Sequence, residues 1–168
     1  LTNGTAYTFT VTATNSSGTS SSSSASAAVT PVALEALTSG VAVSGLSGDE
    51  GSDQYFYIDV PSGAATLTVS LSVGSGDPDI YDDTDNPPPS SGALCQSAFP
   101  PGIDELCTLK SPAESRYYVR LSGYTAYADA SLVATIAVPL GTPSITGITA
   151  GDGSLEVAFT AGAGGAAD

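Results

Sequence analysis

Short runs in which apolar and polar residues alternate strictly are the feature that most limits how this chain can fold. In residues 66–73 every second residue is Leu or Val, and the residues between them are Thr or Ser. Successive side chains of a β-strand point to opposite faces, so such a run gives a strand one apolar and one polar face. The same alternation recurs in residues 7–14, 54–60, 117–121, 132–136 and 155–159. Repeated short strands of this kind predict an all-β fold of packed sheets, a β-sandwich.

Turn-forming residues separate these runs and help to mark the parts of the chain. Pro61-Ser62-Gly63 and Gly74-Ser75-Gly76 are typical of turns between strands. We assign residues 1–31, 33–137 and 139–168 to three domains or parts of domains. The composition favours strands over helices, because Ser, Thr, Gly, Ala and β-branched residues dominate and only 12% of the residues are charged.

The charge balance and the absence of histidine exclude several classes of function. Three basic residues stand against 17 acidic ones, which gives a formal net charge of −14. Binding to nucleic-acid phosphates depends on Lys and Arg, so we expect no nucleic-acid partner. No apolar run approaches the length of a membrane span, so we expect no membrane insertion. Without histidine the chain cannot form a Ser-His-Asp triad, and we expect no catalytic residues and no enzyme activity.

Residues 1–31 have the pattern of a terminal hairpin. An alternating strand carries Tyr7, Phe9 and Val11, a turn follows at residues 15–18, and a serine-rich second strand leads to Val29. These residues resemble the last two strands, F and G, of a fibronectin type III domain. The resemblance implies that Tyr7 is that family's corner tyrosine, whose phenol bonds to backbone just upstream. The serine run by itself also fits a flexible linker, which is the alternative.

Residues 139–168 have the pattern of an initial hairpin. Ile145 and Ile148 belong to one short strand, residues 151–154 form a turn, and the next strand alternates through Phe159. This segment resembles strands A and B of another fibronectin type III domain. Because the sequence begins at Leu1 rather than Met, we interpret it as a mature product or a fragment.

The middle segment carries several separate motifs in a fixed order. They are Tyr55–Gly63, Leu67–Leu71, Gly76–Tyr81, Cys95, Glu105–Thr108 and Tyr117–Tyr124. Together they resemble the bacterial pre-peptidase C-terminal domain. The resemblance implies a jelly-roll-like β-sandwich that is attached to secreted peptidases. One departure is the acidic, proline-rich stretch from Asp82 to Pro89, where that family more often continues a strand.

Cys95 and Cys107 are the only cysteines, and they are twelve positions apart. In an acidic chain of secreted type, two such cysteines are expected to form a disulfide, and the resemblance implies the same pairing. A metal site would need further soft ligands, which the chain lacks. We therefore expect a structural disulfide and a secreted, extracellular or cell-surface location.

The densest acidic cluster suggests a calcium site. Asp77, Asp79 and Asp82 are its candidate ligands, because calcium prefers several carboxylate oxygens supplied by one loop. Some members of the similar family bind calcium, partly through an acidic segment before the first strand, where this chain offers only Glu35. The alternative is an acidic, solvated turn whose carboxylates accept backbone hydrogen bonds.

Two tyrosines near the end of the middle segment are candidate ligand contacts. Tyr124 and Tyr127 follow the strand at residues 117–121, and we name them as candidate contacts for a sugar or a collagen-like polymer. The alternative is ordinary packing at the rim of the sandwich.

The apolar rows of the two end hairpins need a covering layer, because a lone hairpin is marginally stable in water. These rows are Tyr7, Phe9, Val11, Leu155, Val157 and Phe159. The leading interpretation is a non-catalytic structural or adhesive module of an extracellular fibre. Its ends would be completed head to tail by other copies or by adjacent repeats. The alternative is an accessory domain of a secreted bacterial peptidase or hydrolase that binds an insoluble polymer (collagen, chitin or another polysaccharide) or is removed during maturation.

Overall fold

The computed structural model describes residues 1–85, 87–160 and 162. All of its regular elements are β-strands, which confirms the predicted all-β class. The chain divides into two compact units, residues 1–35 and residues 36–168, and each is described by itself. Among the described residues, none lies in a helix that is long and apolar enough to span a membrane.

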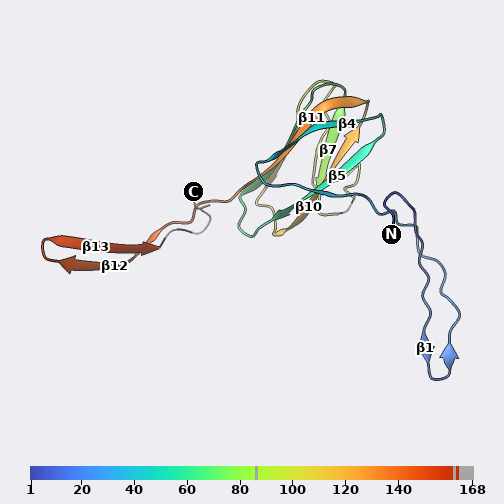
Figure 1. Cartoon of the computed structure of the whole chain (residues 1–168), viewed down its shortest axis with the longest axis horizontal. Coiled ribbons are helices and arrows are strands. Elements are labelled where there is room, and N and C mark those ends of the chain that lie inside the picture. The colour runs from blue at the N-terminus through green and yellow to red at the C-terminus, as the bar shows by residue number, and fades with distance from the viewer. Residues whose placement is uncertain (86, 161, 163–168) are drawn as a thin grey trace. The chain divides into compact units, whose positions relative to one another are not determined.

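The first unit is an irregular hairpin (Figure 1). Only its tip is regular, where β1 (Thr14–Asn15) pairs with β2 (Gly18–Thr19). The Asn15 Oδ1 atom accepts a hydrogen bond from the Ser17 amide at 2.8 Å, which is an Asx turn. Towards the termini, the Tyr7 and Val29 backbones exchange two hydrogen bonds, each 2.9 Å long.

The serine run is hydrogen-bonded to the first half of the hairpin, although it forms no regular β-strand. Ser20, Ser23 and Ser26 donate their amides to the carbonyls of Ala13, Val11 and Phe9 in turn, at 2.8–2.9 Å. The hydroxyls of the same three serines accept the amides of those three partners at 3.0–3.1 Å. Between successive pairs, the serine strand advances by three residues and its partner by two. The partner's amides therefore donate to serine hydroxyls instead of to backbone carbonyls.

The Tyr7 phenol oxygen accepts a hydrogen bond from the Thr2 amide at 2.8 Å. This is the upstream backbone contact that was predicted for Tyr7. Beside it, the side chains of Phe9 and Val11 are exposed. Within this unit, the apolar row has no covering layer.

The second unit contains a sandwich of two antiparallel sheets (Figure 1). The five-stranded sheet has the order β3 (Glu35–Ala36), β5 (Asp53–Val60), β10 (Ser115–Gly123), β7 (Pro78–Asp83) and β8 (Cys95–Ser97). The four-stranded sheet has the order β4 (Ala42–Gly48), β11 (Tyr127–Ala137), β6 (Thr66–Ser72) and β9 (Glu105–Lys110). Strands β8 and β9 are edge strands of their sheets.

The core lies between the two sheets and consists of the apolar positions of the alternating runs. Its largest fully buried apolar side chains are Phe56, Leu67, Val69, Leu71, Ile80, Val119, Leu121 and Leu132. At about 25 cal/mol per Å² of buried apolar surface, each of these side chains contributes roughly 1.5–3 kcal/mol to folding. The opposite face of β5, β7 and β10 is turned away from this core.

The remaining hairpin consists of β12 (Ser144–Gly151) and β13 (Ser154–Thr160). Its turn contains Gly153 with φ of 67°, a backbone conformation that suits glycine. Every residue of both strands is exposed, including Ile145, Leu155 and Phe159. The predicted hairpin is present, with both of its faces open to solvent.

Candidate functional site

The outer face of the five-stranded sheet carries a group of tyrosines. Phe56 and Ile58 of β5 and Val119 of β10 point into the core, so their sequence neighbours point outwards. We call this surface the tyrosine face. It consists of Tyr55, Tyr57, Tyr81, Tyr118, Arg116 and Arg120, of which all but the exposed Arg116 are half-buried.

Strand register brings these residues into adjacent rows. Arg120 lies opposite Tyr55 of β5 on one side and Tyr81 of β7 on the other, while Tyr118 lies opposite Tyr57. The Arg120 guanidinium is 5.4 Å from the centre of the Tyr81 ring, and the Arg116 guanidinium is 4.0 Å from that of Tyr57. Cation–π contacts of this kind hold aromatic rings in place on a rigid sheet.

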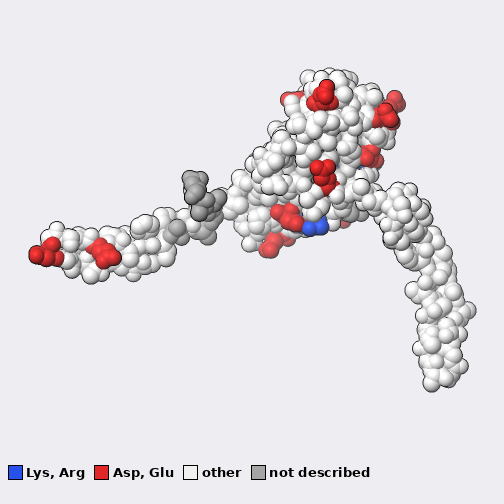
Figure 2. All heavy atoms as spheres, viewed as in Figure 1, with Lys and Arg blue, Asp and Glu red and all other residues white. Residues whose placement is uncertain are grey.

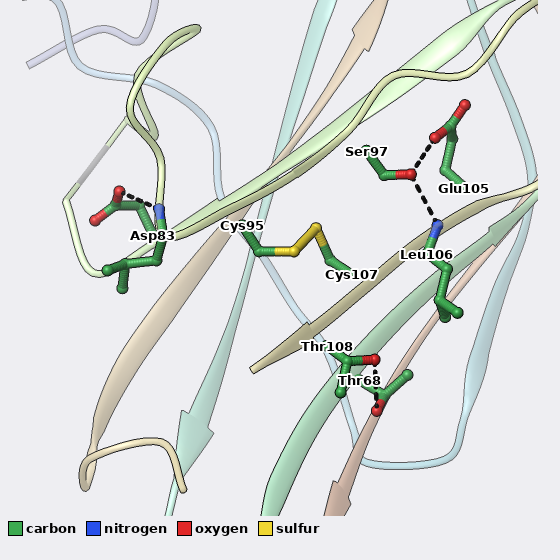
Figure 3. Close-up of a disulfide and its surroundings, with 9 residues drawn as sticks. Thr68, Asp83, Cys95, Ser97, Glu105, Leu106, Cys107 and Thr108 are labelled. Atoms are coloured by element: carbon green, nitrogen blue, oxygen red, sulfur yellow. Dashed lines mark hydrogen bonds between the residues drawn. A yellow bond between two sulfur atoms is a disulfide. The ribbon is translucent and has the colours of Figure 1, made fainter. Parts of the chain in front are cut away.

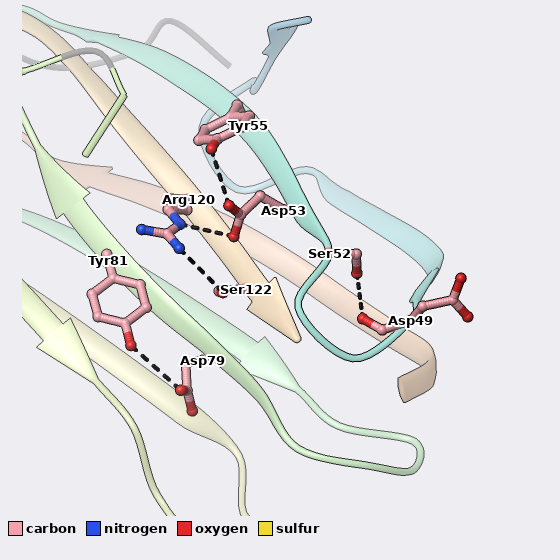
Figure 4. Close-up of polar contacts among 8 residues, drawn as sticks. All are labelled: Asp49, Ser52, Asp53, Tyr55, Asp79, Tyr81, Arg120 and Ser122. Carbon is pink, nitrogen blue, oxygen red and sulfur yellow. Dashed lines mark hydrogen bonds and ion pairs between the residues drawn. The ribbon is translucent and has the colours of Figure 1, made fainter. Parts of the chain in front are cut away.

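Carboxylates fix both arginines. Arg116 donates to the two oxygens of Asp59 at 2.7 and 2.9 Å, and these bonds hold the pKa of Asp59 below its usual value. Arg120 donates its Nε to Asp53 at 2.8 Å, and Asp53 also accepts the Tyr55 hydroxyl at 3.2 Å (Figure 4). Exposed ion pairs contribute little to stability, so their effect here is to orient the face.

The lower end of β7 holds a second carboxyl group on the same side of the sheet. Asp79 accepts a hydrogen bond from the Tyr81 hydroxyl at 3.4 Å (Figure 4). Burial, together with the nearby charges of Asp77 and Glu105, raises the pKa of Asp79 to about 6. The charge beside Tyr81 therefore changes in the mildly acidic range.

The disulfide joins the two sheets at their edge strands. Cys95 of β8 and Cys107 of β9 are bonded, with Cα atoms 5.8 Å apart, and the predicted pairing is confirmed (Figure 3). Next to it, the buried Glu105 accepts hydrogen bonds from the Ser97 hydroxyl and from the Phe99 amide, the latter at 2.9 Å. The edge strands β8 and β9 are thus joined by the disulfide and by the hydrogen bonds of Glu105.

The three candidate calcium ligands lie on different sides of β7. Asp79 is on the outer side with Tyr81, whereas Asp82 shares the inner side with the core residue Ile80. Asp77 precedes the strand and lies near Asp79, whose pKa it raises. The described structure thus brings Asp77 and Asp79 close together and separates Asp82 from them, so the assignment of Asp82 as a calcium ligand is corrected: its carboxyl group lies on the core side, beside the disulfide.

The carboxylate of Asp83, which is buried, accepts hydrogen bonds from three backbone amides. Its Oδ1 atom accepts the amides of Thr84 and Asp85 at 2.7 and 3.1 Å, and its Oδ2 atom accepts the Leu94 amide at 3.1 Å (Figure 3). Strand β7 continues through Asp82 and Asp83, so the expected departure from a strand begins only after them.

The two tyrosines proposed as ligand contacts have different surroundings. Tyr124 is 71% exposed, whereas Tyr127 is only 4% exposed. The Tyr127 hydroxyl accepts a hydrogen bond from Gln54 Nε2 at 2.9 Å. Tyr127 is therefore a core residue with a satisfied hydroxyl, and its assignment as a ligand contact is corrected.

The comparison with protein families bears on this sandwich directly. Residues 52–123, which include strands β5 to β10, match the model of the bacterial pre-peptidase C-terminal domain. These residues form a pre-peptidase C-terminal domain.

Similar proteins are bacterial proteases. Alkaline serine exoprotease A of Vibrio alginolyticus is 41% identical over 105 residues, which are 62% of this chain and 19% of that protein. The virulence metalloprotease of Vibrio anguillarum is 33% identical over 104 residues, which are 62% of this chain and 17% of that protein. The chain spans less than a fifth of the length of either relative.

One solved structure matches this chain over nearly the whole length of the solved structure. The solution structure of vEP C-ter 100 shares 31% sequence identity with this chain, with a TM-score of 0.49. The match covers 60% of this chain and 98% of that one.

The tyrosine face of the pre-peptidase C-terminal domain was not predicted, although the sequence contains its signal. Tyr55 and Tyr57 occupy outward positions of a run whose other positions are Phe56, Ile58 and Val60. Large aromatic residues at the polar positions of an alternating strand place aromatic rings on the outer face of the sheet. The sequence could not show that β10 lies between β5 and β7, because that pairing depends on segments far apart in the chain.

Proposed function

We propose that residues 33–137 are a non-catalytic accessory domain of a secreted bacterial peptidase, and that the tyrosine face binds an insoluble extracellular polymer. The family match and the protease relatives support the accessory role. The observation that carries the polymer-binding part is the set of four half-buried tyrosines on one sheet face, two of which, Tyr57 and Tyr81, lie under arginine guanidinium groups.

The chemistry of the face suggests the kind of polymer. Tyrosine rings stack on the flat faces of sugar or proline rings, and their hydroxyls provide hydrogen bonds at the edge. A net charge of −14 repels polyanions, and acidic side chains are scattered over the face shown in Figure 2 with little basic surface between them, so a neutral or basic polymer is favoured. Chitin and collagen both meet this requirement. The flanking hairpins are proposed to belong to fibronectin type III-like sandwiches, for which the Tyr7 contact is the support.

Replacing Tyr57 and Tyr118 together by Ala is expected to weaken polymer binding at least tenfold, because central aromatic residues supply most of the energy of such contacts. The measurement is sedimentation of the chain with insoluble collagen and, separately, with chitin, in order to identify the polymer.

Leu106→Ala is the control, since Leu106 is exposed on β9 of the other sheet, away from the tyrosine face. It is expected to keep wild-type binding. If the Tyr57 and Tyr118 variant binds both polymers as the wild type does, or if the wild type binds neither, the proposed polymer-binding function is wrong.

A second candidate function is head-to-tail association in a fibre, and the exposed apolar rows of the two hairpins favour it. Phe9 and Val11 on one hairpin and Leu155, Val157 and Phe159 on the other lack a covering layer in the described structure. Burial of such rows against another copy or an adjacent repeat would complete two sandwiches.

Replacing Leu155 and Phe159 by Ser should abolish this association. In sedimentation velocity, the wild type is expected to form species larger than one chain as its concentration rises, whereas the variant remains monomeric. A wild type that is monomeric at all concentrations contradicts the fibre function and leaves the accessory function unaffected.

A further inference from the structure

The inner side of β7 places one carboxyl group against the disulfide. Asp82 is paired in register with Cys95 of β8, and Cys107 faces it from β9. A carboxylate oxygen of Asp82 and the two sulfur atoms all lie within 4.8 Å of one another. Three strands from two sheets thus bring one acid and both sulfurs together.

One carboxyl oxygen of Asp82 is buried without a hydrogen-bond partner among the residues that the structure describes. Its side chain is 1% exposed, and its Oδ1 atom accepts no hydrogen bond in the described structure. On β10 its register partner is the apolar Val119. Glu105, the other buried acid near the disulfide, is already bonded to Ser97 and Phe99. Burying an unpaired carboxyl group is costly, so its neutral form is favoured.

The two sulfur atoms differ in access. Cys107 is 1% exposed, whereas Cys95 is half-buried on the edge strand β8. An external thiol therefore reaches Cys95 first, and Cys107 is the sulfur that leaves. A thiolate leaving into a dry core is strongly disfavoured unless a proton reaches it.

We propose that Asp82 is the proton donor to Cys107 when the Cys95–Cys107 disulfide is opened, and the proton acceptor from Cys107 when it is closed. In opening, the thiolate of a dithiol such as dithiothreitol attacks Cys95 Sγ and forms a mixed disulfide. The Cys95–Cys107 bond breaks, its electron pair goes to Cys107 Sγ, and the Asp82 carboxyl proton is transferred to that sulfur. The second thiol of the reductant then releases Cys95 and becomes oxidised to a cyclic disulfide.

In closing, the same groups act in reverse. An external aliphatic disulfide such as oxidised glutathione accepts the Cys95 thiolate, which gives a mixed disulfide and releases one glutathione thiolate. The Asp82 carboxylate removes the proton of Cys107, whose sulfur attacks Cys95 Sγ and expels the second glutathione thiolate. The buried sulfur can thus exchange its proton without contact with bulk water.

The test is the rate of disulfide reduction by dithiothreitol in the full chain and in the Asp82→Asn variant, measured by thiol labelling from pH 6.5 to 9.5. Comparing the two proteins at one pH cancels the titration of the reductant. The wild type is expected to react about tenfold faster or more at pH 6.5. The ratio of the wild-type rate to the variant rate should fall towards one at pH 9.5. Burial raises the pKa of Asp82 to about 8, so at pH 9.5 the proton donor is deprotonated.

A purely structural effect of Asp82 gives the opposite trend. A charged Asp82 loosens the fold and exposes the disulfide, so the ratio would rise with pH. A rising ratio, or one that stays within twofold of unity throughout, overturns the proposal. Asp85→Asn, which removes an exposed carboxyl group from the adjoining loop, is the matched control and should behave as the wild type.

A measurement on the wild type alone covers the case in which Asp82→Asn does not fold. Its rate constant, expressed per thiolate of dithiothreitol, should fall as the pH rises through 8. A rate constant that is independent of pH in this range also overturns the proposal.

Discussion

Asp82→Asn should stabilise the fold at pH 7, by up to about 4 kcal/mol. Burial raises the pKa of Asp82 to about 8 in the folded chain, whereas an unfolded Asp titrates near its ordinary value of about 3.9. At pH 7 the unfolded carboxyl group is ionised and must be protonated on folding. Because pH 7 lies about three units above the unfolded-state pKa, this protonation costs about 1.4 kcal/mol of folding free energy for each unit. Asparagine has nearly the shape of the neutral acid and does not require that proton.

The sign of this effect changes with pH in a defined way. The folded-state pKa is raised, so the wild type is most stable, with respect to Asp82, below about pH 4, and it loses that stability as pH rises towards 8. Chemical denaturation of both proteins at pH 3.5, 5, 7 and 8 measures the difference. The two proteins should be equally stable at pH 3.5 and should diverge steadily above it.

Glu105→Gln provides the contrasting variant. Glu105 is equally buried, but it accepts hydrogen bonds from Ser97 and Phe99, so replacing an acceptor oxygen by an amide group should destabilise the fold. If Asp82→Asn is less stable than the wild type at pH 7, then the carboxyl group of Asp82 is satisfied in solution and our account of it is wrong.

Removal of the disulfide should cost about 3 kcal/mol of folding free energy. The bond between Cys95 and Cys107 closes a short loop, and the chain-entropy estimate for about a dozen residues gives roughly this value. The change is Cys95→Ala together with Cys107→Ala, since alanine avoids burying a hydroxyl in the core. Guanidinium unfolding at one pH measures the difference.

The location of the disulfide defines a second expected result. It joins the edge strands β8 and β9, so its loss should increase amide exchange in these strands more than in the central strands β10 and β11. Chemically reduced wild type should match the double variant. A loss below about 0.5 kcal/mol would mean that packing and the Glu105 hydrogen bonds already hold this corner.

The alternation of residues predicted the strands because it directly reports which side chains face a core. The run from Gln54 to Val60 corresponds to β5, and residues 66–73 correspond to β6. It failed at the serine strand, whose pairing with a step of three residues has no period of two. There the signal was the spacing of Ser20, Ser23 and Ser26.

The surroundings of Asp82 were predicted less well than the fold. Asp82 was grouped with other acids by proximity in sequence, although its spacing from Ile80 already places both on one face of a strand. Its contact with the disulfide depends on β9, which lies in the other sheet and is distant from β7 in sequence. Local patterns could therefore indicate which way Asp82 points, but not what it meets there.

The unequal advance of the two strands in the first hairpin has a consequence for assembly. The residues between Ser20, Ser23 and Ser26 have no backbone partner in the other strand of the described hairpin. The free edge of this strand therefore lacks the regular row of amides and carbonyls that an additional β-strand would need for pairing. Indiscriminate stacking into amyloid-like ribbons is blocked on this flank. Any molecule that docks on the hairpin must approach across the row of Phe9 and Val11 or along the opposite rim.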